Sequence, residues 1–354
     1  MIILDKLNAV RRFLMQSLTK NIGVNSRNRK IDLSHKIEIK KILICRPNHK
    51  LGNLILVTPL LQEVIATFPN CKIDLFIKGN LGPILFENYE NVDKIINLPR
   101  KHFSHIIQYF KAWTSLKSKY YDLAINIDKN SSSGKLSVLF CNSKYKFFGD
   151  GDEVLNSKHS DYFHIAKFPI YNLRRYLTEL GFEKRELPIA SLNLKLSLSE
   201  IEEGKKIVNN LVDKNDKTIC LYTYATGHKC YSESWWSDFY KALKAQYHDY
   251  NIIEVLPIEN VSQIGFKEPT FYSKNIREIG AVIANTDIFI GADSGIMHLA
   301  SSVKVTTVGL FSVSNIEKYQ PYNNKSVAIN TNDYDFNESI EILNEILIKK
   351  GVYA

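Results

Sequence analysis

Residues 288–300 have the sequence IFIGADSGIMHLA, which predicts one strand, one turn and one helix start. The opening Ile-Phe-Ile run is typical of a buried strand, and the small polar residues after it are typical of a turn. A helix that begins at such a turn offers N–H groups without intrahelical partners and the positive end of its dipole. The stretch therefore predicts an α/β fold with an anion site at this turn, and an ordinary capped turn is the alternative.

The residues of this turn suit a bound phosphate. Ser294 can cap the helix or give its hydroxyl to a phosphate oxygen. Gly295 has no side chain, so a ligand can approach the backbone closely. His298 lies one turn into the helix, where a structural role competes with a ligand contact.

Two earlier segments also combine a strand with a polar loop. Residues 41–53 have the sequence KILICRPNHKLGN, a buried-type strand followed by a loop, and Thr58-Pro59 comes soon after. Residues 229–236 have the sequence KCYSESWW and follow a strand that we predict at 218–223. Ligands of parallel sheets bind beyond the carboxyl ends of the strands, so both loops are candidate parts of a binding site.

Taken in order, the three segments resemble glycosyltransferase family 9, the heptosyltransferase-like enzymes of lipopolysaccharide assembly. That family has a strand ending in a basic residue, a loop ending in Gly-Asp and a Thr-Pro pair. It also has Lys-x-Trp-Pro-x-x-x-Trp and, later, Asp-(Ser/Thr)-Gly-x-x-His-Leu-Ala. The likeness spans residues 40–330 of this chain.

The resemblance implies two Rossmann-like doubly wound domains facing a cleft, the arrangement called GT-B. It implies an inverting transfer from a nucleotide-diphosphate sugar, with an ADP sugar as one candidate donor, and without a metal or other cofactor. The acceptor is then an anionic glycolipid or another cell-envelope glycan. The expected donor-binding residues are Thr223, Thr226, Lys229, Asp293, Ser294, Gly295 and His298, and the expected acceptor-binding residues are Arg46, Gly52 and Asn53.

The chain departs from the family pattern at the usual base candidate. The family's Gly-Asp is Gly52-Asn53 here, and a neutral amide cannot act as a general base. Either His49 in the same loop or Asp128 at the end of a predicted strand could take the proton, or the protein only binds its ligand. We expect a relocated base, with Asp128 ahead of His49, and we expect Asn53 to hydrogen-bond the acceptor.

Composition limits the choice of partners and compartment. The net charge of +9 favours an acidic partner, which can be a nucleic acid, an anionic membrane or a phosphorylated substrate. The basic residues are dispersed and no recognition motif is present, so we expect no nucleic acid. The five cysteines have no Cys-x-x-Cys spacing, which favours a reducing, cytoplasmic location over a disulfide or zinc framework. No apolar run approaches the roughly 20 residues of a spanning helix, and no signal peptide is evident.

The order of strands and helices predicts the domain organisation. Residues 1–38 are expected to form an amphipathic helix and a linker. This helix either lies on the inner face of the cytoplasmic membrane or packs on the body of the protein or at a dimer contact. Residues 39–195 form the acceptor domain, and residues 196–354 form the nucleotide-sugar domain, whose final helix packs back on the first domain. Residues 192–196 alternate like an edge strand, and Ser199 with Glu202 matches a capping box.

Three other functions compete with glycosyl transfer. A nucleotide-sugar epimerase would have the same two-domain fold. A non-catalytic binding protein for nucleotide sugars or glycans would explain Asn53. A dinucleotide oxidoreductase is disfavoured, because no Gly-x-Gly-x-x-Gly follows any predicted strand.

Overall fold

A computed structural model describes residues 15, 17–23, 37–100, 105–213, 216–322 and 325–351. The chain divides into two compact units. Unit 1 comprises Met1–His49 and Pro59–Ala190, and unit 2 comprises Lys50–Thr58 and Ser191–Ala354. Most of the expected N-terminal helix, residues 1–14, lies outside the described residues, and residues 17–19 are helical.

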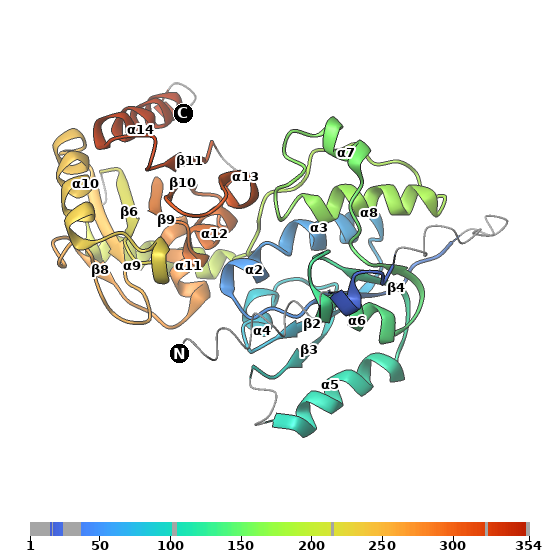
Figure 1. The fold of residues 1–354 in the computed structure, drawn as a ribbon. Helices are drawn as coiled ribbons and strands as arrows, with labels where there is room; N and C mark the ends of the chain where they lie inside the picture. Colours follow the sequence, from blue (N-terminus) through green and yellow to red (C-terminus); the bar gives the residue numbers. More distant parts are fainter. Residues whose placement is uncertain are drawn as a thin grey trace. The chain divides into compact units, whose positions relative to one another are not determined.

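Unit 1 contains a five-stranded parallel sheet with the order β3-β2-β1-β4-β5 (Figure 1). The strands are β1 (Lys41–Arg46), β2 (Lys72–Lys78), β3 (Val92–Leu98), β4 (Tyr120–Asn126) and β5 (Asn142–Phe147). This is the Rossmann order, which reverses between β1 and β4. The central strand β1 is buried from its second residue to its last, as its continuous apolar run predicts.

Helices cover both faces of this sheet (Figure 1). The helices are α3 (Thr58–Thr67), α4 (Gly82–Leu85), α5 (Ile106–Ser118), α6 (Ser132–Phe140), α7 (Glu153–Lys158) and α8 (Phe168–Glu179). Ala112 and Leu116 of α5 and Val138 of α6 pack with Leu43 and Cys45 of β1 in one core. Helices α3 and α8 lie on the opposite face.

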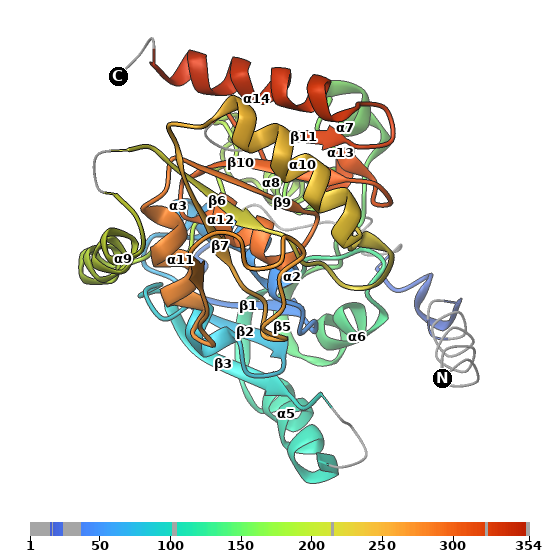
Figure 2. The ribbon, with the colours of Figure 1, turned by 90° about the vertical axis from the view of Figure 1, so that its left-hand side faces the viewer.

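Unit 2 contains a six-stranded parallel sheet with the order β11-β10-β9-β6-β7-β8 (Figure 2). The strands are β6 (Thr218–Tyr222), β7 (Asn251–Val255), β8 (Thr270–Phe271), β9 (Ile288–Ala292), β10 (Thr306–Phe311) and β11 (Val327–Asn330). Counted from β6, this is again the Rossmann order, and it reverses between β6 and β9. The predicted fold class, α/β with two Rossmann-like doubly wound domains of GT-B type, is therefore confirmed.

The helical elements of unit 2 are α2 (Leu51–Ile55), α9 (Leu198–Leu211), η3 (Gly227–Lys229), α10 (Glu233–Gln246), α11 (Ile276–Ala284), α12 (Gly295–Ser302), α13 (Ile316–Tyr319) and α14 (Phe336–Gly351). We expected α14 to pack on the first domain. Within unit 2, its Ile340 and Leu343 pack in the core with Trp236 and Phe239 of α10.

Two local predictions around residue 195 were wrong. Residues 192–196 form no strand. Arg277 donates to the carbonyls of Leu194 and Lys195, so these backbone groups bind a side chain rather than a neighbouring strand. The capping box that opens α9 is formed by Ser197 and Glu200, two residues before the predicted pair, and the Glu200 carboxylate also binds Arg277.

In the part of the chain that the structure describes, no helix combines the length and the apolar character needed to cross a membrane.

Candidate functional site

Unit 2 contains a pocket of about 530 Å³ beyond the carboxyl ends of β6 and β9. This is the position where the strand order reverses, at which open α/β sheets bind their ligands. We call it the unit 2 pocket. Its polar lining residues include Lys50, Asn53, Thr226, Lys229, Glu259, Lys274, Asp293, Ser294, His298 and Tyr319.

The predicted strand–turn–helix at 288–300 forms one wall of the pocket, with β9 ending at Ala292 and α12 beginning at Gly295. The Ser294 hydroxyl accepts a hydrogen bond from the Met297 N–H at 3.3 Å and caps α12. The Gly295 and Ile296 amides come next at the positive end of the helix. The predicted strand, turn and helix start are therefore present, and the capped helix N-terminus opens on the pocket.

Asp293 and Lys229 form an ion pair beside this helix start. The Asp293 side chain is 6% exposed, whereas that of Lys229 is 39% exposed and also lies 5.8 Å from the Tyr319 ring centroid. A buried carboxylate next to an anion site would repel a phosphate. Because Lys229 neutralises Asp293, the wall can still accept negative charge.

The two motif glycines contact each other, because α2 packs on α12. A Cβ atom placed on Gly52 would lie 2.7 Å from His298 Cδ2 and 3.3 Å from Gly295 Cα. A Cβ atom on Gly295 would lie 3.1 Å from Leu51 Cβ. We expected Gly295 to make room for a ligand, and the structure adds that it makes room for α2. His298 belongs to α12, is 5% exposed and lines the pocket.

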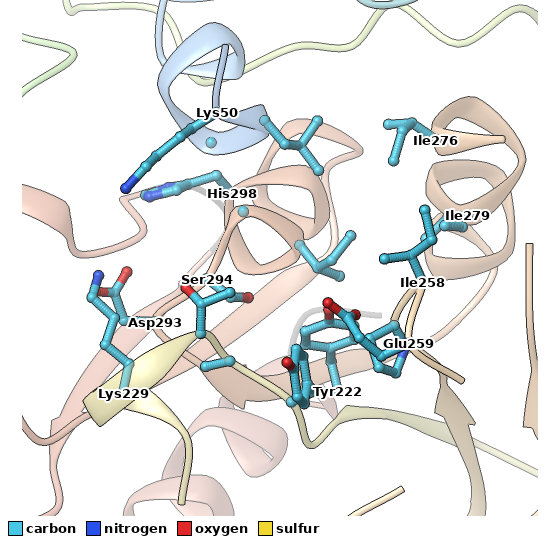
Figure 3. A pocket seen from close by; sticks show the side chains of 18 of the residues that line it. Lys50, Tyr222, Lys229, Ile258, Glu259, Ile276, Ile279, Asp293, Ser294 and His298 are labelled. Carbon is cyan, nitrogen blue, oxygen red and sulfur yellow. The ribbon is translucent and has the colours of Figure 1, made fainter. Parts of the chain in front are cut away.

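The pocket has a polar side and an apolar side (Figure 3). Lys50, His298, Lys229, Asp293 and Ser294 lie toward one side, and Ile258, Ile276 and Ile279 lie toward the other. Tyr222 and Glu259 lie near each other between the two sides. Burial raises the pKa of the Tyr222 phenol well above its usual value, so this hydroxyl stays neutral.

Thr223 does not line the pocket, although we expected it to bind the donor. Its hydroxyl donates to Glu254 at 2.6 Å and accepts from the Gln263 N–H at 3.1 Å. Glu254 is fully buried and accepts a second hydrogen bond from Ser262, and burial raises the pKa of its carboxyl. Side chains alternate along the strand, so Thr223 points away from the site that Tyr222 lines. Thr226 does line the pocket.

Unit 1 holds the other predicted residues at its own point of strand reversal. Arg46 ends β1 and donates to the Asp128 carboxylate at 2.6 Å, and Asn130 N–H donates to the other oxygen at 3.0 Å. The Arg46 side chain is buried, whereas that of Asp128 is 31% exposed. His49 belongs to unit 1, and its Cβ would lie 3.3 Å from a Cβ on Gly79. Gly52 and Asn53, which we expected beside these residues, belong to unit 2.

Several lining residues were absent from the sequence prediction. Lys50 precedes Gly52 by two residues and was passed over in favour of His49. Glu259 follows β7 by four residues, a strand-end position that could have been recognised. Ile276 and Ile279 lie on α11, where a helical apolar pattern gives no sign of a ligand wall.

Among residues that the structure describes, no group of three or more His, Cys, Asp or Glu side chains is arranged to hold a metal ion.

Comparisons with known proteins find similar sequences and similar folds. The sequence profile of glycosyltransferase family 9 (heptosyltransferase) matches residues 273–344, which include α11, β9 and α12. Lipopolysaccharide heptosyltransferase 3 of Escherichia coli is 22% identical over 304 residues, covering 80% of this chain and 87% of that protein.

Two solved structures share the fold. A family 9 glycosyl transferase from Veillonella parvula has a TM-score of 0.69 at 18% identity, covering 90% of this chain and all of that one. The ADP-heptose lipopolysaccharide heptosyltransferase II of E. coli has a TM-score of 0.64 at 16% identity, covering 88% of this chain and all of that one.

Proposed function

We propose that this chain is an inverting heptosyltransferase. Its motifs, its sequence relatives and its fold are like those of the lipopolysaccharide heptosyltransferases of glycosyltransferase family 9. The donor is a nucleotide-diphosphate heptose, with ADP-heptose as our first choice, and the acceptor is a lipopolysaccharide core or a related envelope glycan. The observation that carries the proposal is the unit 2 pocket, which joins a polar side to an apolar side.

The two sides of the pocket fit the two parts of such a donor. The diphosphate would lie at Ser294 and Gly295, where the α12 amides supply positive charge and Lys229 offers further N–H donors. The nucleobase would lie against Ile258, Ile276 and Ile279. Glu259 lines the same pocket, and its carboxylate suits the adjacent hydroxyls of a ribose.

The leaving diphosphate gains charge as the glycosidic bond breaks. Lys229, Lys50 and the α12 amides would stabilise that charge, which is the role that a metal ion plays in other transferases. We therefore propose transfer without a required metal. Transfer that continues at an unchanged rate in excess EDTA supports this point, and transfer that stops and returns on adding Mg²⁺ contradicts it.

The acceptor hydroxyl needs a general base, and we propose Asp128. Its carboxylate is partly exposed, and the buried Arg46 guanidinium fixes its orientation from behind. His49 is the second choice. Gly52 and Asn53 would contact the acceptor, with Asn53 serving as a hydrogen-bonding group rather than a base. The five cysteines are all free thiols, which supports a reaction on the cytoplasmic side.

Nucleotide binding tests the proposal most directly. Calorimetry with ADP, UDP and ADP-heptose should show specific binding, and the melting temperature should rise with the ligand that binds best. Heptose transfer to purified core glycolipids, followed by mass spectrometry, then tests catalysis. Binding of ADP-heptose without transfer to any glycan acceptor would favour the alternative of a non-catalytic binding protein, which Asn53 suggests.

A further inference from the structure

Helix α5 of unit 1 is the most apolar exposed element in the described part of that unit. Ile106, Ile107 and Phe110 are all exposed, with Ile107 at 72% and Phe110 at 65%. Single exposed apolar residues are ordinary, but three within five residues on one short helix are not. Figures 1 and 2 show α5 at the outer edge of unit 1, beyond β3.

The opposite face of α5 holds the helix firmly on the unit. Ala112 and Leu116 are buried in the core, and the Trp113 ring packs edge-on against Phe76 and Phe140. The exposed apolar residues therefore do not result from a loose helix that could turn inward. Phe140, at the end of α6, is itself 44% exposed and extends the apolar surface beside α5.

Basic residues predominate around this apolar surface, and Asp93 lies on β3, which also contacts α5. From residue 94 to residue 121 the sequence contains six Lys or Arg residues and no Asp or Glu. The neighbouring elements α6 and β5 also contain lysines and no acidic residue. Lys111 and Lys117 lie on α5 itself, and Lys117 Nζ lies 5.6 Å from the Phe140 ring centroid.

We propose that α5 docks unit 1 on an anionic lipid bilayer. A helix that lies in the interface buries apolar side chains among the acyl chains and keeps lysines at the headgroups. Ile106, Ile107 and Phe110 would enter the bilayer, while Lys111 and Lys117 would bind anionic headgroups. The absence of acidic residues from α5, α6 and β5 fits such a surface and gives no reason to expect a basic protein partner. This docking does not depend on the proposed transfer reaction.

The test is co-sedimentation of the full chain with vesicles of equal parts phosphatidylcholine and phosphatidylglycerol, without donor or acceptor. Ile107→Glu combined with Phe110→Glu should weaken binding at least about tenfold, because two apolar side chains no longer enter the bilayer. The matched control is Leu198→Glu combined with Val313→Glu, which changes the same charge at exposed apolar residues of unit 2 and should bind like the unchanged chain.

Lysine variants test the electrostatic part. Lys111→Gln combined with Lys117→Gln should weaken binding by about fivefold for each lysine and flatten its salt dependence. Lys205→Gln combined with Lys206→Gln on α9 is the control. Ile107→Leu combined with Phe110→Trp should retain full vesicle binding, since both substitutions keep the surface apolar.

Three outcomes would overturn the proposal. The unchanged chain could fail to bind the vesicles, or the glutamate variant could bind as well as the control. Third, the glutamate substitutions could abolish the cooperative melting transition, or they could dissociate a dimer that sedimentation velocity detects in the unchanged chain. In that third case, another part of this chain or a second copy covers α5. A variant that melts like the unchanged chain, but no longer sediments with vesicles, supports docking through α5.

Discussion

The two units have the same strand order, yet they use the point of strand reversal differently. In unit 1 the ends of β1 and β4 are joined by the Arg46–Asp128 ion pair, which leaves one carboxylate partly exposed. In unit 2 the ends of β6 and β9 open into a pocket of about 530 Å³ with a capped helix at its wall. Strand order fixes where a site can form, and the side chains at those strand ends decide whether it is a single reactive group or a binding pocket.

The largest effect should come from Asp128→Asn. Removing a general base typically lowers turnover by about 10²–10⁴-fold. ADP affinity should stay nearly unchanged, because Asp128 belongs to unit 1 and the pocket belongs to unit 2. The measurements are the transfer rate and calorimetry with ADP. His49→Ala should have a smaller effect on the rate, and the opposite ranking would reassign the base.

Lys229→Gln should lower kcat/KM by roughly 10²–10³-fold, the usual scale for losing one group that stabilises developing charge. Unlike Asp128→Asn, it should also weaken ADP binding, since Lys229 lines the pocket. Glutamine can still donate a hydrogen bond to Asp293, although it no longer neutralises this buried carboxylate. Steady-state kinetics and ADP calorimetry report both effects. Lys241→Gln, on the exposed side of α10, is the control, and equal ADP affinity in both variants would remove Lys229 from the donor site.

Gly52→Ala tests the contact between α2 and α12. The new Cβ would meet His298 Cδ2 at 2.7 Å, so we expect the free energy of unfolding to fall by roughly 1–3 kcal/mol. Urea unfolding measures this loss. Combining Gly52→Ala with His298→Ala should cost less than the sum of the two single variants, because the steric conflict disappears. Strict additivity would mean that the two residues do not meet.

The smallest effect concerns Glu200, which does not line the unit 2 pocket. Hydrogen bonds from Arg277 lower the pKa of Glu200 to about 2. A carboxylate with a depressed pKa stabilises the fold above its unfolded pKa, about 4.3, and this stability is lost as the pH falls towards 2. At pH 7 the urea midpoint of the unchanged chain should therefore be higher than that of Glu200→Gln. The two midpoints should converge as the pH falls towards 2. Glu203→Gln, exposed on the same helix, should show no such convergence.

The positions of the motifs along the chain were predictable from the sequence, whereas the residues that they contact were not. Residues 288–300 gave the strand, the turn and the capped helix correctly, because all three follow from local sequence. Nothing local indicates that Gly295 meets Gly52, since that contact joins distant segments. Thr223 was assigned to the site from its place after a strand, although its side chain points to Glu254. Pattern gives the position along a strand, but the direction of a side chain at its end depends on the tertiary fold.

The segment Lys50–Thr58 has a consequence for how this protein is made. It is synthesised between two parts of unit 1, yet it belongs to unit 2, whose other residues begin only at Ser191. During translation α2 leaves the ribosome long before α12, the helix on which it packs. Unit 2 therefore cannot complete its fold from its own contiguous residues, and a fragment that starts at Ser191 would lack Lys50 and the whole of α2.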